Sequence, residues 1–173
     1  NKGDISDTSS LGGKMNQLIA KASTLLEALP YIQRFRGETF VTKYGGSFMD
    51  SSDPTIRSSV ARDIVFLEAV GINPVVVHGG GKAITQALAD SGVETKFEQG
   101  YRITTQESVK VVEQVLSQKI NPDIVEMINQ HGGKACGFSG TAIFKCRPIK
   151  PLSHTVEPVD IGLVGEVTTV NTE

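Results

Sequence analysis

The chain has 173 residues, of which 39% are hydrophobic and 21% charged, and its formal net charge at pH 7 is −2. This length is enough for one domain with a packed core or for half of a larger protein. The chain has no excess of basic residues, which would be expected of a nucleic-acid-binding protein. Because no apolar run approaches the roughly 20 residues that a membrane span needs, we expect a soluble, cytoplasmic protein with no membrane partner and no nucleic-acid partner.

The N-terminal region divides into a polar segment and a candidate helix. Residues 1–13 are rich in Gly, Ser and Asp, so we expect a disordered tail. Over residues 14–36 we expect an amphipathic helix, because apolar residues recur at spacings of three and four, and Pro30 is expected to end or bend it. The apolar stripe consists of Leu18, Ala22, Leu25, Leu29 and Ile32. It could pack on its own domain or face a partner, and the sequence leaves both interpretations open.

Two short apolar runs each end in consecutive glycines and are followed by a helical pattern. The runs occupy residues 40–46 and 74–81. The helix after the first run is expected to begin at Asp53-Pro54, an N-cap followed by an N1 proline, and the helix after the second is expected to begin at Lys82. Wholly apolar runs that alternate with helices are typical of a parallel sheet, so the fold class is predicted to be α/β.

The remainder of the chain is predicted to contain further helices and then strands. Residues 94–104 are typical of a loop or a short hairpin that could fold over a site. Helical spacing resumes over residues 105–116, and Asn121-Pro122 is expected to begin another helix that ends at Gly132-Gly133. The predicted strands are residues 135–138, 143–149 and 159–170.

The glycine clusters predict a phosphate site. Consecutive glycines allow N–H groups to converge on an anion, and the N-terminus of the following helix adds the positive end of its dipole. Lys43 lies at the end of the first strand, where open α/β sheets bind ligands. Arg102 could hold a carboxylate or could lie in solvent, and we interpret His78 as a structural residue. The spacing matches neither a P-loop nor a dinucleotide-binding fingerprint.

The two cysteines, Cys136 and Cys146, do not indicate a metal site or a disulfide framework. Neither belongs to a CxxC motif or to a cluster of His and Cys. Both lie in apolar, strand-like surroundings. We therefore expect buried, unreactive thiols and no metal ligand.

Six separated motifs resemble, in order and spacing, the N-terminal half of the acetylglutamate kinases of the amino-acid kinase family. The motifs are residues 43–46, 77–82, 100–104, 119–121, 131–135 and 162–167. The resemblance covers residues 39–171 and implies a three-layer αβα sandwich with a mainly parallel central sheet. Residues 37–173 would form its N-terminal, substrate-binding part. The implied reaction is the ATP- and Mg²⁺-dependent phosphorylation of the side-chain carboxylate of N-acetyl-L-glutamate to an acyl phosphate, a step of arginine biosynthesis.

The resemblance also implies residue roles. Lys43 matches a catalytic lysine that stabilises charge on the transferring phosphoryl group. The phosphate-binding matches are Gly45, Gly46 and Gly81, and the substrate-binding matches are Gly80, Gly81 and Arg102. The ATP pocket is expected in a C-terminal half that this sequence does not include, so we expect the 173-residue chain alone to be inactive.

The resemblance has consequences for partners and alternatives. The stripe over residues 14–32 resembles the N-terminal extension through which arginine-inhibited members assemble, which implies a homo-oligomer, and some members are controlled by a nitrogen-regulatory signal protein. The chain departs from the family pattern at Ser47, at Tyr101 and at residues 141–143. A kinase for another acidic amino acid therefore stays open, as does a catalytically silent metabolite-binding and oligomerisation module on the same scaffold.

Overall fold

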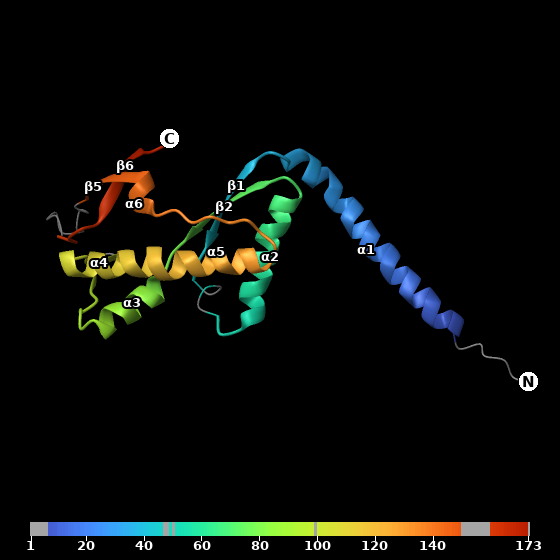
Figure 1. Ribbon diagram of the computed structural model, residues 1–173, viewed down its shortest axis with the longest axis horizontal. Coiled ribbons are helices and arrows are strands. Elements are labelled where there is room, and N and C mark those ends of the chain that lie inside the picture. Colours follow the sequence, from blue (N-terminus) through green and yellow to red (C-terminus); the bar gives the residue numbers. More distant parts are fainter. Residues whose placement is uncertain (1–6, 47–48, 50, 99, 150–159, 173) are drawn as a thin grey trace, which may run out of the picture.

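Two parallel strands form the centre of the structure, a computed structural model that describes residues 7–46, 49, 51–98, 100–149 and 160–172 (Figure 1). Strand β1 (Thr39–Tyr44) pairs with β2 (Asn73–His78) along its whole length, so that Lys43 lies opposite Val77 and Tyr44 opposite His78. Helix α2 (Pro54–Ala69) connects the two strands. This βαβ unit confirms the α/β class.

Helices α2 and α3 begin within one residue of their predicted starts, α2 at Pro54 and α3 at Gly81 rather than Lys82. The Thr55 hydroxyl and N–H donate to the Asp53 carboxylate at 2.7 and 2.8 Å, and these bonds hold the pKa of Asp53 below its ordinary value. Helix α3 (Gly81–Asp90) follows β2 directly. Gly71 and Gly92 come after the two helices with φ of 87° and 72°, a left-handed conformation that glycine adopts without steric cost.

The next helical stretch is continuous, which corrects the expectation that Asn121-Pro122 begins a separate helix. Helix α4 (Gln106–Gln114) leads through the π-helical segment η1 (Val115–Ile120) into α5 (Asn121–Gln130). Figure 1 shows α4 and α5 as one long rod. A proline inside a helix cannot donate a backbone hydrogen bond, and the wider turns of η1 directly before Pro122 accommodate this loss without breaking the helix.

The core lies on one face of the β1–β2 pair, under α2, α3, η1 and α5. Its buried members are Tyr44, Ala61, Ile64, Ile84, Leu88, Val115, Ile120, Ile124, Met127 and Ile128. Side chains alternate across a strand, so Val41, Val75 and Val77 belong to the other face, where they are 71%, 47% and 51% exposed. Within the described residues, helices therefore cover one face of this sheet.

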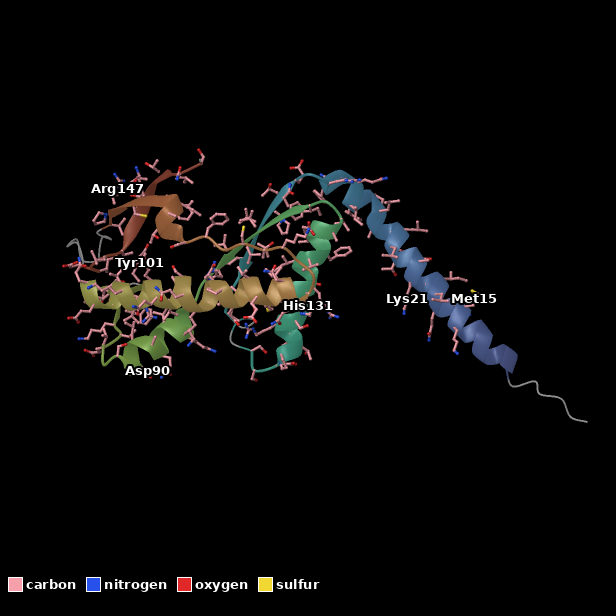
Figure 2. All side chains as sticks on the ribbon, in the orientation of Figure 1. Met15, Lys21, Asp90, Tyr101, His131 and Arg147 are labelled. Atoms are coloured by element: carbon pink, nitrogen blue, oxygen red, sulfur yellow. The ribbon has the colours of Figure 1, made fainter. Side chains whose placement is uncertain are left out.

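Helix α1 (Asp7–Phe35) is longer than expected. It begins at Asp7, so the prediction of a disordered tail as far as residue 13 is wrong for residues 7–13, and residues 1–6 lie outside the described part. It also continues through Pro30, because helix propagation is cooperative and one missing bond near its end does not stop it. The helix projects away from the body, as Met15 and Lys21 show in Figure 2. No helix of the described residues is long and apolar enough to cross a membrane.

Two antiparallel hairpins complete the described structure. Strands β3 (Phe97–Glu98) and β4 (Tyr101–Arg102) form the hairpin predicted within residues 94–104. Strand β5 (Phe144–Pro148), which follows the short helix α6 (Gly140–Ile143), pairs with β6 (Gly165–Val170).

The segment 135–138 corrects a prediction, because it forms no strand. The Ala135 N–H donates to the Asn129 side chain at 2.8 Å, so its backbone bonds to a helix end and not to a neighbouring strand. The expectation of buried thiols is also wrong, since Cys136 and Cys146 are both exposed. The predicted strand from residue 159 begins later, at Gly165, and residue 159 itself lies outside the described part.

Two residues of α2 test where the core lies. Ile64 is 6% exposed and Phe66 is 51% exposed. We expect Ile64→Ala to lower the free energy of unfolding by about 2–4 kcal/mol, because it removes buried methyl groups and leaves a cavity. Phe66→Ala, the matched control, should lower it by less than about 1 kcal/mol. Urea unfolding followed by circular dichroism measures both, and equal losses would contradict this assignment of the core.

Candidate functional site

A cavity of about 710 Å³ opens at the carboxyl ends of β1 and β2, where α3 begins. Its walls come from the turn after β1, from α2, from the start of α3, from the β3–β4 hairpin and from the junction of η1 with α5. The lining residues are Tyr44, Gly46, Met49, Arg57, Gly80, Gly81, Lys82, Ala83, Thr85, Gln86, Phe97, Arg102, Ile120, Asp123 and Ile124. Open α/β sheets bind their ligands at this edge.

The glycine cluster after β2 allows the helical rod to approach the sheet. A Cβ atom on Gly80 would lie 2.5 Å from the Ile120 Cδ1 atom and 3.0 Å from the Leu116 Cδ2 atom. Only a residue without a side chain fits there with both neighbours in place. The N-terminus of α3, starting at Gly81, consequently faces the cavity, and its first N–H groups have no partner within their own helix.

Arg102 is held in the cavity wall by three hydrogen bonds. Its Nη2 group donates to the Thr85 hydroxyl at 2.8 Å and to the Gly81 carbonyl at 3.4 Å, and its Nη1 group donates to the Thr95 hydroxyl at 3.1 Å. The guanidinium also lies over the Phe97 ring, 4.7 Å from the ring centre. A guanidinium has five N–H donors, so two of them stay available to a ligand.

An ion pair between Arg57 and Asp123 forms another part of the cavity wall and joins α2 to α5. Partial burial opposes the charge of Arg57, but the Asp123 carboxylate and the neighbouring Tyr44 hydroxyl outweigh this effect and raise the pKa of Arg57. The Tyr44 hydroxyl and the Arg57 Nε atom are both buried, and neither has a hydrogen-bond partner of good geometry. The sequence gives no local signal of this cluster, because its residues belong to three separate elements, β1, α2 and α5.

The charges of the lining residues favour an anionic ligand. Of the described lining residues, Arg57 is paired with Asp123, whereas Arg102 has only neutral hydrogen-bond acceptors. Within the described ranges, no group of three or more His, Cys, Asp or Glu side chains could hold a metal ion. The cavity can therefore hold carboxylate or phosphate oxygens, and this part of the chain offers no metal centre of its own.

The structure brings together some of the sequence-predicted site residues. Gly46, Gly80, Gly81 and Arg102 all line the cavity. Lys43 does not, because it alternates with Tyr44 and extends from the exposed face of the sheet. Gly45 is also absent from the lining, and a Cβ atom on it would be 4.0 Å from the Lys43 Cε atom. Lys43 and Gly45 are thus neighbours at the edge of the sheet, beside the cavity.

The positions at which the chain departs from the family pattern lie away from the cavity lining or outside the described part. Tyr101 and residues 141–143 are not among the lining residues. Ser47 lies outside the described residues.

His78 makes two hydrogen bonds at the end of β2, which fit the structural role expected of it. Its Nδ1 atom lies 3.1 Å from the Gly79 carbonyl, which only accepts, so Nδ1 carries the proton in the neutral ring. The Nε2 atom then accepts from the Asn121 Nδ2 group at 3.2 Å. The sequence points to Asn121 as a helix start and as part of a motif, but it does not predict this contact. The contact links the end of β2 to the first residue of α5.

Comparison with known proteins identifies relatives of this chain. The profile of the amino acid kinase family matches residues 38–173. An acetylglutamate kinase of Akkermansia muciniphila is 46% identical over 91% of this chain and 52% of its own length. An acetylglutamate kinase of Geobacter sulfurreducens is 47% identical over 92% of this chain and 56% of its own length. The chain therefore spans about half the length of the curated relatives that it matches.

Solved structures share the fold at lower sequence identity. The N-acetylglutamate synthase of Neisseria gonorrhoeae, complexed with coenzyme A and N-acetyl-glutamate, superposes with a TM-score of 0.63 at 22% identity, covering 87% of this chain and 33% of the synthase. The protein smu.665 of Streptococcus mutans gives a TM-score of 0.60 at 23% identity, with 78% and 51% covered. At these identities the likeness concerns the fold alone.

The packing of η1 against Gly80 can be tested by adding a methyl group at this position. Gly80→Ala should lower the free energy of unfolding by about 1 kcal/mol, because the new methyl group meets the ends of the Ile120 and Leu116 side chains and forces them out of their present rotamers. Gly79→Ala is the control, since a Cβ atom there has no neighbour within 4 Å. Denaturant unfolding of both variants checks the prediction. A Gly80→Ala protein as stable as the control would contradict the close packing of Ile120 and Leu116 against Gly80.

Proposed function

The chain belongs to the amino acid kinase family, and from this premise we propose that it is the substrate-binding part of a kinase that phosphorylates N-acetyl-L-glutamate with ATP. The observation that carries the proposal is the meeting of Arg102 with the N-terminus of α3 in one cationic cavity. The curated relatives named acetylglutamate kinase support this choice of substrate. The implied place of the reaction is arginine biosynthesis in the cytoplasm.

The cavity suits a substrate with two carboxylates. We assign the carboxylate that does not react to the free N–H donors of Arg102, a charge-assisted bond that fixes the substrate's orientation. The reacting side-chain carboxylate would then lie near Gly46 and the first N–H groups of α3. Gly80 and Gly81 would allow its close approach, because they add no side chain between the backbone and the ligand.

ATP would supply the phosphoryl group: a bond forms between a carboxylate oxygen and the γ-phosphorus, the bond to ADP breaks, and the product is an acyl phosphate. For this transfer the protein has mainly to position the reactants and to balance the charge of the phosphoryl oxygens. We assign Lys43 to charge stabilisation and the N–H groups of Gly45, Gly46 and Gly81 to the phosphate. The open N-terminus of α3 fits such oxygens. A Mg²⁺ site does not follow from these residues, because Asp123, the one carboxylate among the described lining residues, is paired with Arg57.

The exposed sheet face supports the three-layer αβα arrangement. Sheets with parallel strands are usually covered on both faces, and Val41, Val75 and Val77 form an apolar surface on the face opposite to α2 and α5. We infer that a second helical layer covers this surface. The nucleotide pocket would then lie on the side of the sheet edge where Lys43 extends.

Helix α1 is proposed as an oligomerisation element that binds a second copy of the chain. Most apolar residues of its stripe, including Leu18, Leu25 and Leu29, are exposed along a helix that projects from the body (Figure 1). Their three- and four-residue spacing is the pattern with which two helices pack against each other. A nitrogen-regulatory signal protein is a further partner that the family resemblance suggests.

Substrate binding is tested by calorimetry on the full-length natural protein that contains this sequence. We expect N-acetyl-L-glutamate to bind and plain glutamate to bind more weakly. Arg102→Ala should weaken binding at least tenfold, because a charged hydrogen-bond partner is worth about 1.5–3 kcal/mol. Arg62→Ala, an exposed arginine of α2 outside the cavity lining, is the control and should bind like the parent. The proposal fails if the parent does not bind N-acetyl-L-glutamate, or if Arg102→Ala binds it equally well.

Assembly through α1 is tested by the mass in solution. Deletion of residues 1–35 should lower the number of chains in each particle, because it removes the exposed apolar stripe. The combined variant Leu18→Ser, Leu25→Ser and Leu29→Ser should act in the same direction, whereas Lys21→Ser should leave the mass unchanged. Size-exclusion chromatography with light scattering gives the measurement. An unchanged molecular mass after deletion would contradict assembly through α1.

A further inference from the structure

We propose that Phe97 is a positioning residue that sets the carboxylate specificity of the cavity through Arg102. The inference rests on the proposed function and deepens it, because it concerns the same substrate pocket.

The hairpin register places Phe97 and Arg102 together. Phe97 pairs with Arg102 across β3 and β4, and Glu98 pairs with Tyr101. Directly opposite residues share a face of an antiparallel pair, and the next pair lies on the other face. Phe97 and Arg102 therefore both face the cavity and line it, whereas Tyr101 does not line it. The register thus separates a cavity-facing pair from a pair on the far side.

The Phe97 ring supplies one face of the Arg102 environment. The guanidinium carbon lies 4.7 Å from the ring centre, well within the range of a cation–π contact. Thr85, Thr95 and the Gly81 carbonyl accept in-plane hydrogen bonds from Arg102. Stacking on the ring and bonding at the edges together restrict both the tilt and the rotation of the guanidinium plane. The two free N–H donors are consequently held in a fixed direction before any ligand arrives.

The charge of Arg102 has no carboxylate partner in the part of the chain that the structure describes. Glu94, the acidic residue before β3, pairs with Lys96 at 3.0 Å. Glu98 belongs to the opposite face of the hairpin. All three acceptors of Arg102 are neutral, and the ring stabilises its charge without neutralising it. A carboxylate of the ligand is then the partner that completes the site, and an uncharged amide in its place would leave the guanidinium unpaired.

The stacking explains why an exposed aromatic residue occupies this position. Phe97 is 58% exposed in the structure, so its ring contributes little to the core. Loss of the ring should leave the fold intact but allow Arg102 to move and to bind water. We expect weaker carboxylate binding and a smaller preference for the carboxylate over the amide, with little effect on the rate of a bound substrate.

The test compares three variants of the full-length natural protein. Phe97→Leu should raise the Kd for N-acetyl-L-glutamate about fivefold, within the range expected for loss of a cation–π contact, and leave kcat within about twofold. Phe97→Tyr keeps an aromatic ring and should restore binding to within about twofold of the parent. Tyr101→Leu removes an aromatic ring from the other face of the same hairpin and should also bind within about twofold. Thermal unfolding of each variant confirms that it is folded.

A second readout separates positioning from a general structural effect. The ratio of the Kd for the α-carboxamide analogue of N-acetyl-L-glutamate to the Kd for the acid should be smaller in Phe97→Leu than in the parent. An equal ratio in both proteins, or a Phe97→Tyr variant as weak as Phe97→Leu, would overturn the inference while the proposed function stands. A parent protein that does not bind N-acetyl-L-glutamate at all would overturn both.

Discussion

The parallel pairing of β1 with β2 is the constraint on which the site depends. Parallel pairing brings the carboxyl ends of both strands to one edge, with Tyr44 opposite His78. The two glycine turns, which are 33 residues or more apart in the sequence, therefore open into one space. An antiparallel pair would place one glycine turn at each end of the sheet and would separate Gly46 from Gly80. The cavity exists because the chain crosses back through α2 and runs in the same direction twice.

The helical rod from α4 to α5 is fixed against this edge by contacts that need small residues. Gly80 accepts the close approach of Ile120, and Gly137 accepts the Asn121 side chain, since a Cβ atom on it would overlap the Asn121 Oδ1 atom. The π-helical segment ends just before Asn121, and π-helical turns change the direction in which the following side chains point. Asn121 can then donate to His78 at the end of β2. The two glycines, the π-helical segment η1 and the Asn121 amide together fix the rod beside the start of α3, which lines the cavity.

Local chemistry made much of the fold predictable, and long-range contacts explain what was missed. Capping by Asp53 and the short hairpin within residues 94–104 each depend on residues adjacent in sequence, and each is confirmed. The pair Arg57–Asp123 joins residues 66 positions apart on two helices, and no periodic pattern in either helix indicates that their side chains meet. The absence of a strand at residues 135–138 has a similar cause, because the Asn129 side chain binds that backbone.

The two arginines of the cavity differ in a way that concentrates ligand recognition at one of them. Arg57 is neutralised by Asp123 and lies beside the buried Tyr44 hydroxyl, so its charge is already used to join α2 to α5. Arg102 is held as firmly, but by two threonine hydroxyls, a carbonyl and a ring, none of which carries charge. Rigidity without neutralisation is what a preorganised anion site requires, because the ligand then neither breaks an ion pair nor orders a side chain on binding. A carboxylate in place of Thr85 or Thr95 would also accept a hydrogen bond from Arg102, but it would neutralise the guanidinium and weaken the binding of an anionic ligand. Ligand binding therefore depends on the neutrality of these partners as well as on the arginine.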